Sequence, residues 1–142
     1  MLTPPATTFV DTNILMYAHD ERPDRRCKLA RELLAHLWDT HTGVISIQVL
    51  QEFYANATKV FKLAMPHDQA RRVVANYSRW RVIPTDPEMI TSASRMLEEH
   101  SLSFWDALIV QAALRASATF LASEDLQDGR KFGSLTVRNP FA

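Results

Sequence analysis

Four acidic side chains stand where a parallel sheet would gather them. Asp11 directly follows the apolar run "TFV", and Asp125 comes just after "TFLAS". Glu52 lies in the early turns of the helix predicted after "GVISI". Asp106 lies in the first turn of the helix that leads into "TFLAS", so its place at the same edge depends on tertiary packing. Ligands of open parallel sheets bind beyond the carboxyl ends of the strands, which makes these acids candidate site residues.

Carboxylates gathered at one edge would repel one another and raise their own pKa values, so a cation should neutralise them. Mg²⁺ and Mn²⁺ prefer oxygen ligands and commonly work with carboxylates on phosphate chemistry. No zinc cluster competes, because Cys27 stands alone and the histidines lack metal-ligand spacing (His19, His36, His41, His67 and His100). The sequence also has no "GxSxG" serine elbow, and its three glycines cannot form a Gly-rich phosphate loop.

Two of these acids are also well placed to cap helices. Asp11 could cap the helix that begins near Asn13, because its carboxylate can accept from the free amides of a first turn. Asp106 follows Ser103 by three residues, which matches a capping box. Taken one at a time, a structural role is the commoner explanation for such acids.

The other two acids have equally ordinary explanations. Glu52 could be solvated on the polar face of its helix, opposite an apolar stripe predicted to run from Leu50 to Phe61. Asp125 lies in "SEDLQDGR", where acidic residues are common turn formers. Only the joint placement of all four acids favours a site.

Strand and helix candidates alternate along the chain. Runs typical of strands are "TFVD", "GVISI", "RVIPT", "TFLAS" and "LTVRN". Helices are predicted over residues 24–40, 48–62, 67–80, 87–100 and 103–116. This alternation predicts an α/β fold with right-handed crossovers and a mostly parallel sheet covered on both faces. We expect one domain, over residues 8–142.

The composition excludes several classes of protein. The formal charge is zero, with 16 basic and 16 acidic residues, so any charged site must be local. The apolar runs are far shorter than the roughly 18 residues of a membrane span. "MLTPPATT" lacks the features of a signal peptide, and the single cysteine cannot form an intrachain disulfide. A cytoplasmic location is therefore expected.

Four separated segments resemble the PIN-domain family: "VDTNILMYA", "SIQVLQEFYANAT", "SFWDALIVQAA" and "SEDLQDG", followed by "VRNPF". More narrowly, the sequence is similar to VapC-type toxins of toxin–antitoxin pairs. The resemblance runs from about Phe9 to the end, with the motifs in the family's order. It implies a three-layer α/β/α fold and a Mg²⁺- or Mn²⁺-dependent endoribonuclease. It also implies homodimers and a cognate antitoxin protein as partner.

The resemblance assigns the catalytic and metal-binding roles to Asp11, Glu52, Asp106 and Asp125. Three further residues would hold the ligands in position through hydrogen bonds: Thr12, Asn13 and Ser123. We expect an activated water to attack an RNA phosphodiester, with no covalent enzyme intermediate. Glu124 and Asp128 are nearby acids whose roles stay open.

Contacts with RNA are less easily predicted. Basic residues form only small groups, Arg71 with Arg72, Arg79 with Arg81, and Arg130 with Lys131, so RNA binding should be local and salt-sensitive. Trp80 could stack on a base, but packing is the commoner role of a tryptophan at a helix end. Phe104 and Trp105, beside Asp106, are expected to anchor the core.

Rival functions fit the sequence less well. An aspartyl-phosphate phosphatase needs Asp-x-Asp where this chain has Asp11, Thr12 and Asn13. A receiver domain needs a phosphorylatable aspartate after its third strand, and "RVIPT" has none until Asp86. The remaining alternative is a non-catalytic PIN-fold module that binds RNA or a protein, against which the presence of all four acids argues.

Overall fold

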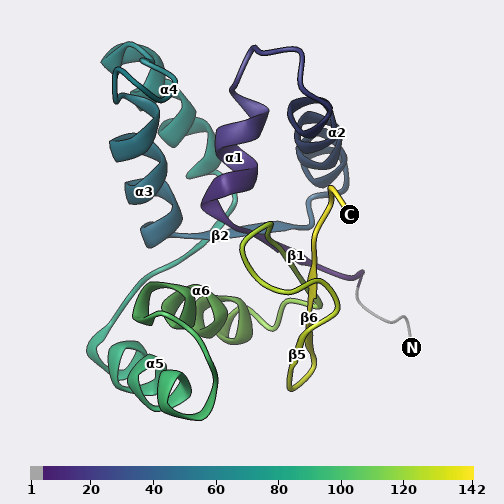
Figure 1. Ribbon diagram of the computed structural model, residues 1–142, viewed down its shortest axis with the longest axis vertical. Helices are drawn as coiled ribbons and strands as arrows, with labels where there is room; N and C mark the ends of the chain where they lie inside the picture. The colour runs from purple at the N-terminus through teal and green to yellow at the C-terminus, as the bar shows by residue number, and fades with distance from the viewer. Residues whose placement is uncertain (1–4) are drawn as a thin grey trace.

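A six-stranded sheet forms the middle layer of the protein (Figure 1). The computed structural model describes residues 5–142. The strands are β1 (Thr8–Val10), β2 (Gly43–Ser46), β3 (Arg81–Ile83), β4 (Phe120–Ala122), β5 (Lys131–Phe132) and β6 (Leu135–Arg138). Their order is β3-β2-β1-β4-β6-β5, and every neighbouring pair is parallel except β5 with β6. The predicted α/β class and mostly parallel sheet are confirmed.

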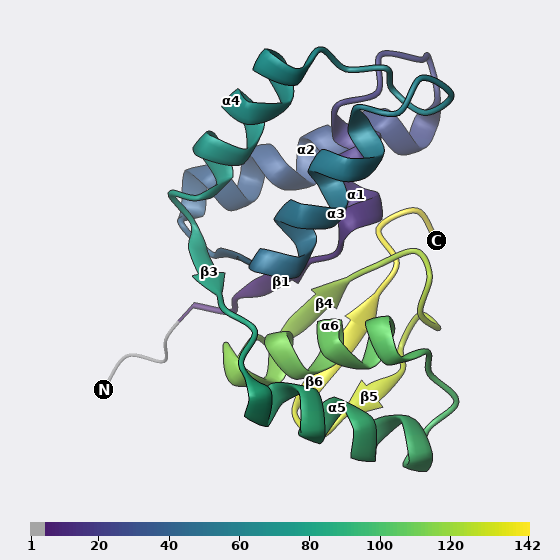
Figure 2. The ribbon, with the colours of Figure 1, turned by 90° about the vertical axis from the view of Figure 1, so that its left-hand side faces the viewer.

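Helices cover both faces of the sheet. The helices on one side of the sheet are α1 (Thr12–Ala18), α2 (Arg25–Thr40), α3 (Ile47–Ala57) and α4 (His67–Tyr77), as Figures 1 and 2 show. On the other side lie α5 (Pro87–Glu99) and α6 (Phe104–Arg115). The expected three-layer α/β/α arrangement is confirmed. Within residues 5–142, no helix has both the length and the apolar character that a membrane span requires.

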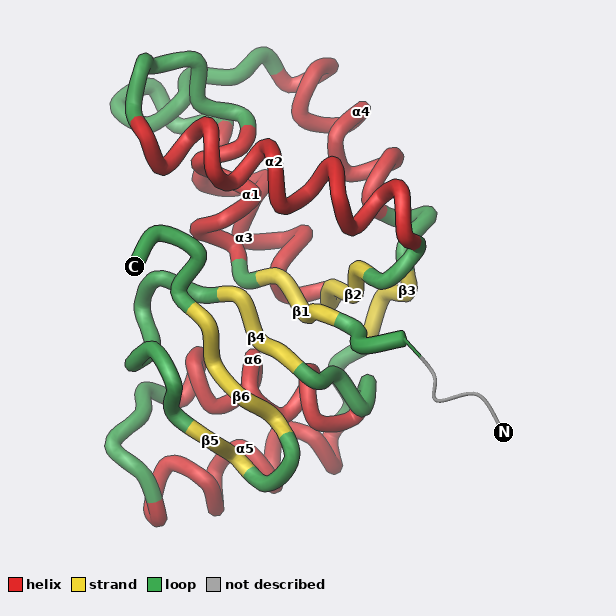
Figure 3. The backbone as a smooth tube through the Cα atoms, turned by 90° about the vertical axis from the view of Figure 1, so that its right-hand side faces the viewer, coloured by secondary structure: helices red, strands yellow, loops and turns green. Residues whose placement is uncertain are grey.

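Strand β1 lies between β2 and β4, as the backbone tube in Figure 3 shows. Phe9 and Val10 are wholly buried, because a central parallel strand is covered on both faces. The register sets Val10 beside Ala122, and the Asp11 amide donates to the Ala122 carbonyl over 3.0 Å. The residues that follow β1 and β4 therefore emerge at the same edge, as the sequence predicted.

The helix predicted over residues 48–62 is too long. Helix α3 ends at Ala57 instead of continuing to residue 62. The Met65 amide donates to the Ala57 carbonyl over 2.9 Å, which closes residues 58–64 into a turn. Because the helix stops, Val60 and Phe61 do not join the expected apolar stripe, and their side chains are 86% and 84% exposed.

Smaller differences concern β5 and α4. The short strand β5 is absent from the prediction, because two residues show no alternation of apolar and polar side chains. Helix α4 ends at Tyr77 instead of Trp80. Trp80 is a packing residue, as expected: its ring centre lies 5.3 Å from that of Trp38 and 5.1 Å from that of Tyr77.

The Trp80 ring occupies the space beside Gly43 at the start of β2. A Cβ atom at Gly43 would lie 2.5 Å from atoms of that ring, much closer than van der Waals contact. We expect Gly43→Ala to lower the free energy of unfolding by about 1–3 kcal/mol, because the packed tryptophan must move. Urea denaturation followed by circular dichroism measures this change.

A double-mutant cycle supplies the control for this prediction. In a Trp80→Leu background the side chain that meets the new Cβ is gone, so Gly43→Ala should cost much less there. An equal loss of stability in both backgrounds would contradict the proposed steric cause.

Candidate active site

One cleft brings together the four acids singled out in the sequence. It has a volume of about 1130 Å³, and Asp11, Glu52, Asp106 and Asp125 all line it. Asp11 and Asp125 follow the ends of β1 and β4, and the other two belong to early turns of α3 and α6. The packing of α6 against the sheet thus brings Asp106 to this edge, which spacing alone could not decide.

Asp11 is the most deeply buried of the four acids, with only 5% of its surface exposed. Its Oδ1 atom accepts from the Thr12 amide over 2.7 Å, and its Oδ2 atom accepts from the Ser123 hydroxyl over 2.8 Å. Asp11 is also the N-cap of α1, so the capping explanation applies as well. The cap uses one carboxylate oxygen, and the second oxygen ties α1 to the end of β4.

Burial raises the pKa of Asp11 to about 7, although the bonds from Ser123 and Thr12 lower it. The nearby Asp125 and Glu52 carboxylates add to the rise. Burial likewise raises the pKa of Asp106, with a smaller upward contribution from Asp125. The carboxylates therefore repel one another as anticipated, but loss of solvation is the larger cause of the shifts.

Thr12 positions Glu52. The Thr12 hydroxyl donates to Glu52 Oε1 over 2.8 Å, across 40 positions of sequence. Glu52 is half-buried and bonded into the site, so it is not simply a solvated residue on a polar helix face. Since the Thr12 amide also holds Asp11, this one residue orients two of the four acids.

The segment after β4 is held by Ser123 and Asn13. Ser123 is fully buried, and its hydroxyl oxygen accepts from the Asp125 amide over 3.2 Å while donating to Asp11. The Asn13 side-chain carbonyl accepts from the Glu124 amide over 3.4 Å. Thr12, Asn13 and Ser123 therefore all bond to the acids or to the backbone that carries them.

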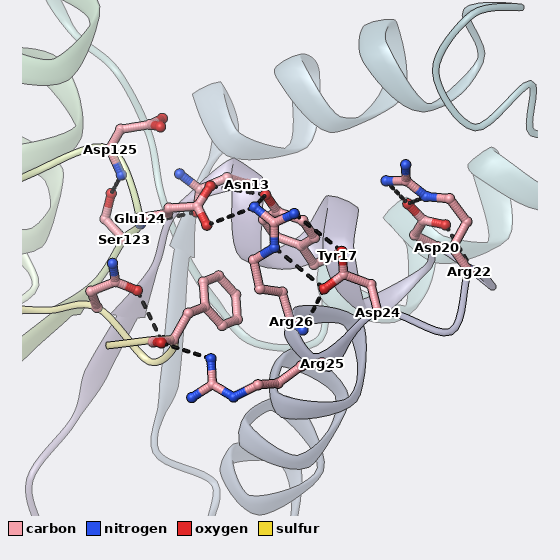
Figure 4. Close-up of polar contacts among 12 residues, drawn as sticks. Asn13, Tyr17, Asp20, Arg22, Asp24, Arg25, Arg26, Ser123, Glu124 and Asp125 are labelled. Carbon is pink, nitrogen blue, oxygen red and sulfur yellow. Dashed lines mark hydrogen bonds and ion pairs between the residues drawn. The ribbon is translucent and has the colours of Figure 1, made fainter.

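The two nearby acids left open by the sequence are engaged elsewhere. Glu124 accepts from the Tyr17 hydroxyl over 2.9 Å and lies 3.5 Å from the Arg26 guanidinium (Figure 4). Arg26 also donates to the Tyr17 hydroxyl over 2.9 Å. Asp128 accepts from the Asn139 amide over 2.8 Å. Neither of these acids lines the cleft.

Several residues at the cleft were not predicted to lie there. Trp105 was expected in the core, but it is 62% exposed and lines the cleft, and only its neighbour Phe104 is half-buried. Two cationic side chains, Arg22 and Lys62, also line it. Nothing local in the sequence marks Arg22 or Lys62, because both are distant along the chain from the four acids.

The chemistry of the donor set fits a hard divalent cation. The four acids supply only oxygen atoms, the preferred ligands of Mg²⁺ and Mn²⁺. Within residues 5–142, no three acidic, histidine or cysteine side chains come close enough to surround one ion together. Mg²⁺ usually retains several waters and needs only one or two carboxylates in direct contact, so this open arrangement suits a hydrated ion.

The buried carboxyl of Asp11 should make the cation-free protein less stable as the pH rises. Its pKa is about 7 in the folded protein against an ordinary value of 3.8, so the folded state binds the proton more tightly than the unfolded chain. The free energy of unfolding therefore begins to fall near pH 3.8, falls further toward pH 7 and reaches its full loss above that pH. Asp11→Asn has no carboxylate to ionise, so this loss of stability does not occur in the variant. At pH 8 we expect its free energy of unfolding to exceed that of the wild type by on the order of 2–4 kcal/mol.

Scanning calorimetry in EDTA between pH 5 and 8 measures this difference, which should shrink toward pH 5. The asparagine keeps both bonds, because its carbonyl accepts from Thr12 and its amide can donate to Ser123. Ser123→Ala makes the opposite change: it removes a bond that lowers the pKa of Asp11 and should steepen the loss of stability. Equal pH profiles for Asp11→Asn and the wild type would refute the argument.

Comparisons with solved structures find the same fold in toxin–antitoxin proteins. A toxin–antitoxin complex from Klebsiella pneumoniae gives a TM-score of 0.70 at 19% identity, covering 94% of this chain and 98% of that one. VapBC2 from Rickettsia felis, bound to a fragment of promoter DNA, gives a TM-score of 0.65 at 22% identity. The match covers 94% of this chain and 98% of that one. VapC20 from Mycobacterium tuberculosis gives a TM-score of 0.63 at 19% identity. The match covers 84% of this chain and 90% of that one. At these identities the likeness shows the fold alone.

A comparison with curated proteins finds no match. The family model for the PIN domain matches residues 8–128, which is most of the chain and includes all four acids of the cleft. The resemblance noted in the sequence is thereby confirmed: this chain belongs to the PIN domain family.

Proposed function

We propose that this protein is a metal-dependent endoribonuclease and the toxin of a toxin–antitoxin pair. The observation that carries the proposal is the gathering of four carboxylates in one cleft, with Asp11 buried and held by two hydrogen bonds. Membership of the PIN family supports nuclease chemistry. VapC20, which shares the fold, is described as a toxin that cleaves the sarcin–ricin loop.

In this proposal Asp11, Glu52 and Asp106 hold Mg²⁺ or Mn²⁺, and Asp125 completes the site. When bound, such an ion neutralises charge on the phosphate and lowers the pKa of a coordinated water. Without an ion, the cleft would repel an RNA phosphate, because its acidic residues outnumber its cationic ones.

The chain's own contribution is to keep the carboxylates in place. Ser123 and the Thr12 amide fix the two oxygens of Asp11, and the Thr12 hydroxyl fixes Glu52. Deep burial lets Asp11 hold a proton near neutral pH until a cation displaces it. Cation affinity should therefore weaken as the pH falls below about 7.

The proposed partners are an RNA substrate, a cognate antitoxin and a second copy of this chain. The Klebsiella, Rickettsia and Salmonella typhimurium structures that share the fold contain a toxin with its antitoxin. They support the antitoxin as a partner of this protein. The homodimer and the cytoplasmic location stay predictions from the sequence.

The alternative function is that of a non-catalytic PIN-fold binding module. A module of this kind would bind RNA or a protein and leave RNA intact. The following cleavage experiment distinguishes the two functions.

We expect the purified protein to cut total cellular RNA into discrete fragments with Mg²⁺ or Mn²⁺ and to leave it intact in EDTA. Asp11→Asn keeps the size of the side chain but removes its charge, so cleavage should fall at least 100-fold, a typical loss for an essential charged group. Glu52→Gln, Asp106→Asn and Asp125→Asn should also reduce it. Gel electrophoresis and sequencing of fragment ends measure the effect.

Glu124→Gln and Asp128→Asn are the matched controls, because these acids are close in sequence to Asp125 but do not line the cleft. Each should retain most of the activity. If the wild type leaves RNA intact with either metal yet binds it, the non-catalytic alternative replaces the proposal.

The toxin role predicts a growth phenotype. Expression of the wild type in bacteria should arrest growth, and co-expression of a small protein encoded beside it should restore growth by binding the toxin. Asp11→Asn, expressed to the same level, should not arrest growth because its site lacks the charge. Growth arrest that persists although the neighbouring protein forms a complex with the toxin would argue against the antitoxin assignment.

A further inference from the structure

Two exposed aromatic side chains line the same cleft as the acids. Phe61 is 84% exposed and Trp105 is 62% exposed, and both belong to the lining. Large exposed aromatic side chains beside a polar site commonly mark a binding surface. Neither residue has a part in the chemistry proposed above.

Trp105 is presented by a fixed backbone. The Gln48 side-chain amide donates to the Trp105 carbonyl over 3.1 Å, which ties the start of α6 to the start of α3. The Phe104 and Trp105 rings pack edge to face, with 5.3 Å between their centres. Ser103 caps the helix, its hydroxyl accepting from the Asp106 amide over 3.0 Å. The backbone that carries the indole is therefore fixed, and both Trp105 and Asp106 line the cleft.

Phe61 lies in the closed turn that follows α3. The Ala64 amide donates to the Lys59 carbonyl over 2.9 Å, and the buried Met65 anchors the end of the turn. This short turn leaves Phe61 in solvent and places the cationic Lys62 next to it in the lining of the cleft. A flat apolar surface and a positive charge thus occur side by side.

The size and charge of the cleft suit a polymer with flat apolar groups and phosphates. Its volume of about 1130 Å³ exceeds the roughly 300–1,000 Å³ of small-ligand pockets. Because acids dominate the lining and the chain's net charge is zero, attraction between charges alone would hold a polyanion weakly. Stacking of bases on aromatic rings supplies affinity that does not depend on charge.

We infer that Trp105 and Phe61 are stacking platforms for unpaired bases of the RNA that enters the cleft. Bases within a duplex are already stacked and paired, so they cannot use these surfaces. This inference rests on the proposed function and assigns two substrate-binding residues to the same cleft.

Binding can be measured without cleavage by placing Asp11→Asn in every protein. The probe is a fluorescein-labelled single-stranded RNA of about 12 nucleotides and mixed sequence, followed by anisotropy. Trp105→Ala and Phe61→Ala should each weaken binding about 5- to 100-fold, the range for loss of one stacked base. Trp105→Phe should retain most of the affinity, because it keeps an aromatic face. A blunt RNA duplex of equal length should bind more weakly and respond little to these changes.

Ile90→Ala is the matched control, since Ile90 is an exposed apolar residue of α5 that does not line the cleft. Tryptophan fluorescence adds a readout specific to stacking. RNA should quench the parent protein and lose that effect in Trp105→Phe, because Trp38 and Trp80 pack against each other away from the cleft. In the protein that keeps Asp11 and can cleave RNA, Trp105→Ala should raise KM while kcat changes less than about threefold.

Unchanged RNA binding by both alanine variants would overturn the inference. So would intact RNA binding with loss of self-association or of antitoxin binding, which would assign the aromatic residues to a protein interface. Failure of the proposed function looks different: the active chain would bind RNA without cutting it, and the stacking test would still give its result. Binding of no RNA at all would refute both.

Discussion

The arrangement of the site depends on burying one carboxylate at the edge where β1 and β4 end. Asp11 can lie at 5% exposure because its two oxygens accept from Thr12 and Ser123, so neither is left without a partner. The parallel pairing of β1 with β4 brings Ser123 to it. A buried charged carboxylate is still costly, and its raised pKa expresses that cost. The fold therefore keeps a destabilising group where a cation can relieve it.

Thr12 and Ser123 each bond to two neighbours in the site. Thr12 bonds to Asp11 through its amide and to Glu52 through its hydroxyl. Ser123 bonds to Asp11 and to the backbone of Asp125. In the same segment, Glu124 accepts from the Tyr17 hydroxyl and lies 3.5 Å from the Arg26 guanidinium (Figure 4). Helix α1 and the segment after β4 thus form one bonded unit.

The sequence predicts those features that depend on strand ends and local spacing. Asp11 and Asp125 could be placed because parallel strands end at a common edge, whereas Asp106 needed the packing of α6. The end of α3 could not be predicted, because it depends on the return of Met65 to Ala57. The bond from Tyr17 to Glu124 spans 107 positions, and no local pattern encodes it.

The short outer strands of the sheet constrain how the protein can associate. Strand β3 has only three residues and is followed by Pro84, which has no amide hydrogen to donate. Strand β5, at the other edge, has two residues and carries Lys131. Short, charged or proline-bounded edges discourage the addition of a foreign strand. Any second copy or protein partner should therefore meet this chain through its helices and loops, leaving the order of the sheet unchanged.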